Sequence, residues 1–318
     1  MTSILITGSN GFIGGSFAKR ARAKNWQVSG LDLQPQDAGG YCHIYKSVDL
    51  SSPQASGTLR ELPPPDLILH AGGISGFMVE ADNPGRIVAV NIAGTMPVIE
   101  LALRCKSRRL VLCSTVMTYG PDRIPGTPRL ETEYPEPISI YGASKVALEA
   151  LMHGFRGQYG LDAIALRFGH VYGPGRTTQC FVRDMLAAAC ERRPCHIPQA
   201  SQSLRQYVYI EDVGHSIDLA IEAEAPRSRV FNIAGDEIHT LEEVAAEVRA
   251  QVGGPEVSFD DSCDLPNYRV GKLSIVRARA ELGYRPEFSL AAGIRSYWDE
   301  AFASRRSLDN DATVKEQT

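Results

Sequence analysis

The segment SIYGASKVALE (residues 139–149) places a tyrosine and a lysine four residues apart, with small residues between them. If this segment is a helix, Tyr141 and Lys145 share one face and can point at the same ligand. A free tyrosine has a pKa of about 10, which is too high for a general base at neutral pH. A nearby ammonium and a positively charged ligand both favour the phenolate and lower that pKa. The spacing suggests a proton-transfer pair, with one turn of an ordinary amphipathic helix as the alternative.

A second motif that could have a chemical function is ILITGSNGFIG, an apolar run followed by three regularly spaced glycines. Glycine allows a sharp turn and a close approach to a diphosphate, and a helix that starts there offers free N–H groups and a positive dipole end. A purely structural turn is the alternative, but the position between a strand and a helix favours nucleotide binding. The predicted contacts are Gly8, Gly11, Phe12, Ile13 and Gly14.

Asp32 ends the second apolar run, 18 residues after Gly14. A carboxylate at this position can accept hydrogen bonds from the hydroxyls of an adenosine ribose. It would repel a 2′-phosphate, and no arginine follows closely in DLQPQDAGG. The sequence therefore favours NAD over NADP, with a turn-forming aspartate as the alternative.

These residues need a scaffold, and the first half of the chain predicts one. Short apolar runs alternate with stretches whose apolar residues have helical spacing. Uninterrupted apolar strands that alternate with helices indicate a parallel sheet covered on both faces, which is a doubly wound α/β fold with ligands beyond the carboxyl ends of its strands. The predicted strands are residues 3–7, 28–33, 43–50, 66–73, 109–115 and 163–168.

The pattern loosens after about residue 170, where prolines, glycines and arginines become frequent. We therefore expect residues 1–170 to form the cofactor-binding domain, with segments near 205–235 returning to it. Residues 171–318 are expected to form mainly a smaller, mixed substrate-binding domain. The polar stretch 304–318 is predicted to be a frayed tail.

The composition excludes several classes of protein. The chain has 318 residues, a net charge of −4 and no basic stripe, which argues against nucleic-acid binding. No apolar stretch is expected to span a bilayer, and the N-terminus lacks the pattern of a signal peptide. The seven cysteines have no C-x-x-C spacing and the seven histidines have no H-E-x-x-H spacing, so we expect no metal site. A reduced, cytoplasmic, soluble protein is the expectation.

Eight motifs along the chain resemble, in their order and spacing, those of the extended short-chain dehydrogenase/reductase family, and most closely its nucleotide-sugar epimerases and dehydratases. The resemblance runs from residue 3 to about residue 300 and implies a Rossmann sheet, an NAD cofactor and a sugar or sugar-nucleotide substrate. The motifs are TGSNGFIG, VDL, HAGG, VNIAGT, CSTVMTYG, YGASK, RFGHVYGPG and RQYVYIEDV.

The resemblance also implies roles for residues along the cofactor. Asp49 and Leu50 would flank the adenine. The segment HAGG would pass beneath the dinucleotide and contribute Ala71, Gly72 and Gly73.

At the reacting end, the resemblance implies that Thr115, Tyr141 and Lys145 are catalytic. Tyr141 would take a proton from a substrate hydroxyl as hydride leaves the same carbon, and Thr115 would hydrogen-bond that oxygen. Lys145 would also grip the nicotinamide ribose. Asn91 in VNIAGT would help to hold the nicotinamide side, with a structural role in its helix as the alternative.

The residues after Thr115 bear on the reaction. Dehydratases of the family resemble STDEVYG, in which an acid and a glutamate drive the elimination of water, and the related decarboxylases also use that glutamate. Here Val116 and Met117 occupy those places. Apolar side chains cannot do acid–base work, so oxidation and reduction at one carbon remain.

The substrate side gives mixed signals. Arg205 matches the arginine that family members direct at a sugar-nucleotide diphosphate, and its planar fork suits phosphate oxygens. Arg176 is expected to assist, with a solvated loop arginine as the alternative, and Ser75 is also predicted to contact substrate. His170 stands where most epimerases have asparagine, and Gln206 replaces the usual aspartate. These departures weaken the case for a UDP-sugar, and His170 either contacts substrate or packs under its loop.

Three functions remain open. The first is an NAD-dependent epimerase that inverts one carbinol carbon of a nucleoside-diphosphate sugar, at C4. The second is an NAD-dependent dehydrogenase or reductase of a free sugar, a sugar acid or a small hydroxy compound. The third is a non-catalytic NAD-sensing protein, against which the retained Thr115, Tyr141 and Lys145 argue. Family members commonly dimerise through two helices that correspond to residues 92–104 and 145–158, so a homodimer is expected.

Overall fold

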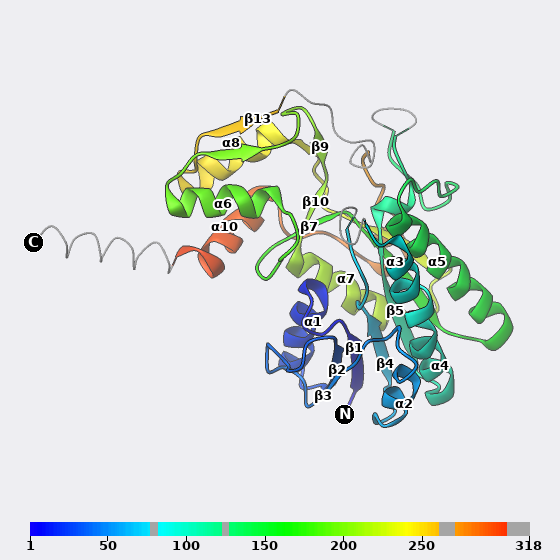
Figure 1. Cartoon of the computed structure of the whole chain (residues 1–318). Coiled ribbons are helices and arrows are strands. Elements are labelled where there is room, and N and C mark those ends of the chain that lie inside the picture. The colour runs from blue at the N-terminus through cyan, green and yellow to red at the C-terminus, as the bar shows by residue number, and fades with distance from the viewer. Residues whose placement is uncertain (77–81, 123–126, 261–270, 304–318) are drawn as a thin grey trace, which may run out of the picture.

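A seven-stranded parallel sheet forms the larger lobe of the computed structural model, which describes residues 1–76, 82–122, 127–260 and 271–303 (Figure 1). The strand order is β11-β6-β5-β4-β1-β2-β3, and every neighbouring pair is parallel. The strands are β1 (Ser3–Thr7), β2 (Gln27–Asp32), β3 (Ile44–Ser47), β4 (Leu67–His70), β5 (Arg109–Thr115), β6 (Ala163–Phe168) and β11 (Val230–Ile233).

Helices cover both faces of this sheet, because alternate side chains of each strand point to opposite faces. Ile4 and Ile6 of β1 belong to a core shared with α1 (Phe12–Ala23) and α7 (Ile210–Glu222). Leu5 belongs to a second core on the opposite face. That core is formed with α2 (Ala55–Arg60), α4 (Met96–Cys105) and α5 (Ile140–Tyr159). The predicted doubly wound fold is confirmed.

Three of the six predicted strands have the predicted bounds, one is shifted by a single residue (27–32 instead of 28–33), and two are shorter. The strand predicted over 66–73 ends at His70 in β4, and the strand predicted over 43–50 is limited to Ile44–Ser47 in β3. In both cases the polar or glycine residues at the carboxyl end leave the sheet. Those residues include Asp49 and Gly72, and they line the cleft described below.

The smaller lobe contains short strand pairs packed with three helices (Figure 1). Helix α8 packs against both α6 and α10. The elements are β7 (His170–Tyr172), α6 (Phe181–Glu191), β8 (Cys195–Ile197), β9 (Leu204–Arg205), β10 (Tyr207–Tyr209), β12 (His239–Thr240), α8 (Leu241–Val252), β13 (Val257–Phe259) and α10 (Leu290–Ala301).

The chain crosses between the lobes more than once. Strand β10 pairs with β7 in a small sheet of its own, whereas α7 packs on α1 and β11 joins the main sheet beside β6. A further helix, α9 (Val276–Leu282), packs on β11. Part of the segment 205–235 thus lies in the sheet lobe. The predicted polar tail 304–318 lies outside the described residues.

One segment differs from the expectation that no stretch could span a bilayer. Residues Pro84–Cys105 are long and apolar enough to cross a membrane by length and composition. In the structure they form α3 (Pro84–Asn91), a short 3₁₀ turn η1 (Ala93–Thr95) and α4. Four apolar side chains of α4, including Val98 and Leu101, are buried in the core against the sheet. Their apolar character is explained by this packing.

Candidate active site

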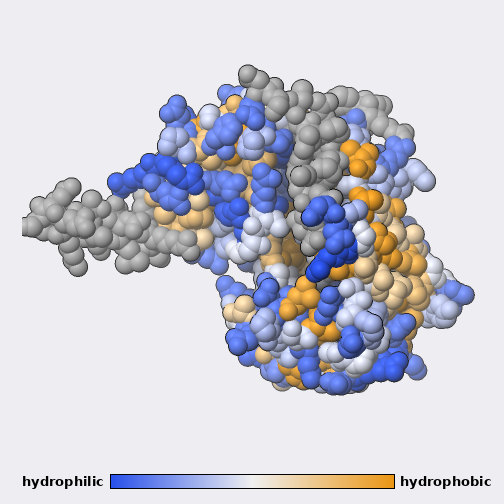
Figure 2. All heavy atoms as spheres, in the orientation of Figure 1, coloured by the Kyte–Doolittle hydropathy of each residue, from blue (hydrophilic) through white to orange (hydrophobic). Residues whose placement is uncertain are grey.

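A cleft of about 690 Å³ lies at the carboxyl ends of the sheet strands and extends toward the smaller lobe. The surface in Figure 2 is hollowed between the two lobes. Residues of the glycine turn, β2, the loop after β4, the end of β5 and the start of α5 line one part of the cleft. Residues 168–181, Arg205 and Tyr207 line the other part. This is the position at which doubly wound folds bind ligands.

The glycine turn brings the loops after β1 and β4 into contact. Gly8 has a φ of +67°, and a β-carbon there would lie 2.8 Å from the Cα atom of Gly72. A β-carbon at Gly14 would lie 2.0 Å from the carbonyl oxygen of Gly8. Helix α1 begins at Phe12, and its N-cap residue Gly11 makes no side-chain cap hydrogen bond. The free N–H groups and positive end of the helix at this cleft fit a diphosphate.

Asp32 lies in the cleft wall at the end of β2, as predicted. Its carboxylate accepts hydrogen bonds from the backbone N–H groups of Asn10 (3.0 Å) and Gln34 (3.3 Å). The Asn10 side chain, which the sequence analysis did not single out, donates to the carbonyl of Gln36 (2.8 Å) and accepts from the N–H of Ala38 (2.9 Å). Asn10 therefore fixes the loop after β2 against the glycine turn. Its position inside TGSNGFIG was the available signal.

Asp49 and Leu50 also line the cleft, beyond the end of β3. The Ser51 hydroxyl (2.6 Å) and backbone N–H (2.9 Å) both donate to the Asp49 carboxylate. These hydrogen bonds lower the pKa of Asp49, so the carboxylate is ionised at neutral pH. Arg86 of α3 lines the same part of the cleft and was not predicted.

Asn91 has the structural role in its helix that the sequence analysis gave as the alternative. It is buried, and it does not line the cleft. Its amide pairs with both backbone groups of Ile74, accepting from N–H (2.8 Å) and donating to C=O (3.0 Å), and it donates to the Ser144 hydroxyl (3.0 Å). These bonds give Asn91 a bracing role, and its help in holding the nicotinamide side stays a prediction. Asn91 ties the loop after β4 to α5 because a buried amide must satisfy its hydrogen bonds.

Tyr141 and Lys145 lie in the first two turns of α5, and both side chains are buried against the cleft. The Ser139 hydroxyl caps this helix by accepting from the N–H of Gly142 (3.0 Å). The Lys145 ammonium lies 5.9 Å from the centroid of the Tyr141 ring. The i, i+4 spacing therefore places both functional groups on one face, as the sequence analysis expected.

Thr115, at the end of β5, faces the Tyr141 hydroxyl. Burial raises the pKa of Tyr141 to about 12, and its hydrogen bond with Thr115 offsets part of that rise. The sequence analysis expected Lys145 to lower this pKa, but Lys145 is not among the groups that shift it here. Burial lowers the pKa of Lys145 itself. The surroundings of Tyr141 thus leave its pKa above the ordinary value of 10, and a positively charged ligand in the cleft would lower it.

The residues after Thr115 form the short turn η2 (Val116–Thr118). Val116 and Met117 line the cleft. Neither can donate or accept a proton, so this part of the wall contributes no second acid–base group. The local structure agrees with the argument against dehydration.

The substrate half of the cleft contains His170, Arg176, Arg205 and Tyr207. Burial and the two arginines lower the pKa of His170 to about 3, so the imidazole is neutral at physiological pH. The centroids of the His170 and Tyr207 rings are 6.0 Å apart. His170 lies in the cleft wall, and its imidazole is close enough to Arg176 and Arg205 for their positive charges to disfavour its protonation.

The two arginines are held by the protein. Arg205 is 1% exposed, its guanidinium lies 5.9 Å from the ring centroid of Phe181, and it donates to the carbonyl of Leu204 (2.7 Å). Arg176 donates to the carbonyl of Val171 and to the Thr178 hydroxyl.

Ser75 lies in the cleft wall and is exposed. Phe181 and Tyr207 line the cleft and were not predicted. Phe181 belongs to no motif, whereas Tyr207 lies in RQYVYIEDV, two residues after Arg205, and that motif was the available signal.

A glycine turn at an uncapped helix, a carboxylate after the second strand and a Thr–Tyr–Lys set define a dinucleotide-dependent oxidoreductase site. Residues 4–234 match the model of the NAD dependent epimerase/dehydratase family. The match covers more than half of the chain, and the protein belongs to this family. The family and the NAD cofactor predicted from the motifs are confirmed.

Individual relatives are distant in sequence but similar over nearly the whole chain. The UDP-glucose 4-epimerase of Mycolicibacterium smegmatis is 28% identical over 308 residues, which cover 91% of this chain and 95% of that protein. The crystal structure of Thermus thermophilus UDP-glucose 4-epimerase in complex with NAD has a TM-score of 0.82 at 27% identity, covering 94% of this chain and 98% of that one. A partial consensus L-threonine 3-dehydrogenase has a TM-score of 0.85 at 20% identity, covering 95% and 99%, and is similar in fold alone.

Proposed function

We propose that this protein is an NAD-dependent 4-epimerase of a nucleoside-diphosphate sugar. The observation that carries the proposal is the combination of Thr115, Tyr141 and Lys145 with apolar Val116 and Met117 in one cleft. This set can move one proton and position one hydroxyl, and it has no group for eliminating water. The UDP-sugar epimerases among the relatives support the same reaction class.

The residues around the glycine turn suit the binding of NAD. The N-terminus of α1 would hold the diphosphate, Asp32 the adenosine ribose, and Lys145 the nicotinamide ribose. When bound, the nicotinamide supplies a hydride acceptor and donor, and its positive charge favours the Tyr141 phenolate.

Proton transfer is the work of the chain itself. Tyr141 accepts the proton of the substrate hydroxyl when the carbinol carbon is oxidised to a ketone, and it returns the proton when that ketone is reduced on its other face. The Thr115 hydroxyl hydrogen-bonds the same oxygen in both directions. Both residues are buried, which limits the access of water to the transferred proton.

Arg205 and Arg176 support a substrate with a diphosphate. Two guanidiniums beside a neutral imidazole form a positive pocket, and the planar fork of arginine binds phosphate oxygens bidentately. A diphosphate would anchor the nucleotide while leaving the sugar free to present either face to the reacting groups.

A dehydrogenase of a free sugar, a sugar acid or a small hydroxy compound is the second candidate. The departures at His170 and Gln206 favour it. Gln206 is buried and donates to the carbonyl of Gly235 (2.6 Å) while accepting from the N–H of Leu273 (2.6 Å). A neutral amide thus occupies a position next to Arg205 where most epimerases have a carboxylate.

One assay separates these candidates. The purified protein is incubated with NAD and, in turn, with UDP-glucose, UDP-galactose, free sugars and sugar acids, while NADH absorbance and product NMR are followed. Interconversion of the two UDP-sugars without NADH accumulation is expected. Steady NADH formation with a free sugar or acid would instead establish the dehydrogenase.

We also propose that residues 1–170, with α7 and β11, form the cofactor-binding domain and that the smaller lobe mainly binds substrate. The six described cysteines are free, which supports a reducing compartment such as the cytoplasm.

We also propose a homodimer through the helices over 92–104 and 145–158, because members of the family commonly dimerise through the corresponding helices. Val88 in α3 and Ile140 at the start of α5 are exposed, and apolar surface is visible on that side in Figure 2. Sedimentation equilibrium at micromolar concentration should give twice the chain mass, and a monomer would contradict the proposal.

A further inference from the structure

Glu149 lies one helical turn after Lys145 on α5 and is 5% exposed. A buried carboxylate is costly unless it is paired and hydrogen-bonded. Arg167 of β6 supplies charge-assisted hydrogen bonds from Nε to Oε1 (3.0 Å) and Oε2 (3.2 Å) and from Nη2 to Oε2 (2.6 Å). The Ser114 hydroxyl donates another, to Oε1 (2.5 Å).

These hydrogen bonds join β5, β6 and α5, and residues of all three elements line the cleft. Ser114 precedes Thr115 on β5, and Arg167 precedes Phe168 on β6, where both Thr115 and Phe168 line the cleft. Glu149 is on the same helix as Tyr141 and Lys145. Its carboxylate therefore sets the distance between the strand that presents the threonine and the helix that presents the tyrosine and lysine.

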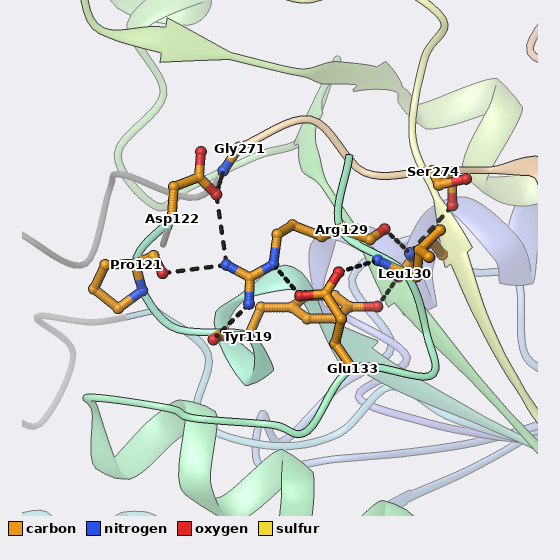
Figure 3. A network of polar contacts seen from close by, with 9 residues as sticks. Tyr119, Pro121, Asp122, Arg129, Leu130, Glu133, Gly271 and Ser274 are labelled. Carbon is orange, nitrogen blue, oxygen red and sulfur yellow. Dashed lines mark hydrogen bonds and ion pairs between the residues drawn. The ribbon is translucent and has the colours of Figure 1, made fainter. Parts of the chain in front are cut away.

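Arg167 is itself fixed. Its guanidinium carbon lies 4.7 Å from the ring centroid of Tyr119, whose hydroxyl donates to Oδ1 of Asn232 (2.7 Å). The guanidinium of Arg129 lies 5.1 Å from the same ring. Figure 3 shows the bonds that hold Arg129 at Tyr119. Since the ring is held by these contacts, Arg167 is held against Glu149.

The charges around Lys145 make Glu149 distinctive. Cys113 and Glu149 both favour the charged form of Lys145 against the lowering of its pKa by burial. However, burial raises the pKa of Cys113 to about 12, so this thiol is neutral near pH 7. His70 on β4 is also neutral, because burial lowers its pKa to about 3. Tyr141 is neutral in the protein alone, which leaves Glu149 as the negative charge acting on Lys145 among these groups.

We infer that Glu149 is a positioning residue of the reaction: it holds Thr115 and Phe168 in register with Tyr141, and its carboxylate, one helical turn from Lys145, favours the charged form of that lysine. The inference rests on the proposed function only for its effect on turnover. Its effect on Lys145 is a property of the protein without substrate. The competing explanation is an ordinary buried ion pair that only stabilises the fold.

The chain offers a matched control at the other end of the same strand. Arg109 begins β5, is 5% exposed, and donates from Nη2 to Oδ2 of Asp162 (2.8 Å). Neither residue lines the cleft. Replacing Asp162 by Asn removes the charge of a carboxylate that pairs with an arginine of β5, without touching the site. The Asp162 side chain is more exposed than that of Glu149 (34% against 7%), so D162N controls for the loss of an arginine-paired carboxylate and is expected to cost less stability than E149Q.

The first test measures the protonation of Lys145 directly. The full-length protein is pulse-labelled with acetic anhydride over a range of pH, and the modified fraction of Lys145 is determined by mass spectrometry. In E149Q the midpoint should fall by about one pH unit or more, since an opposite charge at short range produces shifts of that size. D162N should match the parent. A parent-like midpoint in E149Q would overturn the inference.

Because E149Q leaves Arg167 buried without its partner, it can fail to fold. The double variant E149Q/R167M removes both charges and keeps the midpoint measurable. A downward shift smaller than that of E149Q is expected, because the positive charge of Arg167 is lost as well. An unshifted Lys145 in a folded double variant would overturn the inference.

A second test separates geometry from charge. E149D keeps the carboxylate but shortens its reach, so kcat with UDP-galactose should fall at least tenfold while KM stays within twofold. Parent-like kcat in E149D would refute the positioning role. If the parent does not convert UDP-galactose, the proposed function fails, whereas the labelling experiment still decides whether Glu149 controls Lys145.

Discussion

Gly142 lies so close to Met117 that a β-carbon at residue 142 would be 2.4 Å from the carbonyl oxygen of residue 117. The glycine follows Tyr141 directly, and the carbonyl belongs to the turn that follows Thr115. This contact sets how near α5 approaches the end of β5, and with it the separation between the tyrosine and threonine hydroxyls.

Substituting Gly142→Ala should therefore lower turnover by at least tenfold. The added methyl group must push the start of α5 away from η2, because a backbone oxygen cannot yield as a flexible side chain can. Misplacing a catalytic group by about 1 Å can cost about a hundredfold in rate. Steady-state kinetics with UDP-galactose and NAD would measure the effect.

Two other glycines of the same helix provide the control for this substitution. A β-carbon at Gly154 or Gly157 would meet nothing within 4 Å. Alanine at either position should preserve activity and raise the free energy of unfolding by about 0.5–1 kcal/mol, as expected for an interior helical glycine. Equal losses of activity in all three variants would show that the contact with Met117 is not responsible.

Tyr141→Phe should reduce turnover by at least about 10²–10⁴-fold, the usual contribution of a positioned general acid or base. NAD affinity, measured by calorimetry, should change little, because the phenyl ring is retained. Tyr134→Phe is a suitable control, since Tyr134 is 82% exposed. Unchanged turnover in the Tyr141 variant would refute its role as the base.

The sequence was sufficient for six strands of the sheet, the glycine turn and the shared face of Tyr141 and Lys145, because each of these depends on local spacing. Apolar runs buried on both faces read directly as parallel strands, and Tyr141 and Lys145 share a face because the helix has 3.6 residues per turn. Asp32 could be placed for the same reason, since the end of a strand fixes which edge of the sheet a residue occupies.

Contacts that depend on packing could not be predicted in this way. Asn91 lies in a recognisable motif, yet whether its amide faces the cleft or the backbone of Ile74 depends on a loop far away in sequence. The raised pKa of Tyr141 could not be predicted either. Burial raises it, and the burial of a side chain depends on the whole fold, not on a helical neighbour such as Lys145. Glu149 was missed because its role depends on its pairing with Arg167, which lies 18 residues later on β6.

Asp32→Ala should weaken NAD binding by about tenfold, which corresponds to about 1.4 kcal/mol for a lost charge-assisted hydrogen bond to a ribose hydroxyl. It should also reduce the preference for NAD over NADP, since the carboxylate that repels a 2′-phosphate is gone. Calorimetric titration with both dinucleotides checks this. Asp299→Ala, on the exposed face of α10, should bind NAD as tightly as the parent does. An unaltered NAD affinity in the Asp32 variant would show that Asp32 does not contact the ribose.

The buried His70 should make the protein sensitive to acid. Its two ring nitrogens bond the hydroxyls of Thr7 (2.8 Å) and Thr95 (2.9 Å), and burial lowers its pKa from 6.5 to about 3. As the pH falls below about 6.5, the unfolded chain binds a proton that the folded chain does not, so the free energy of unfolding decreases until the pH reaches about 3. The loss from this one group is about 1.4 kcal/mol per pH unit within that window.

Urea unfolding at pH 7 and pH 5 tests this contribution. His70→Gln should start from a lower stability, because the glutamine amide cannot reproduce both hydrogen bonds, but it should lose less stability between the two pH values. His153→Gln, at an exposed position of α5, should lose as much as the parent. A parent-like loss in the His70 variant would mean that other buried groups, such as His170 in the cleft, account for the acid sensitivity.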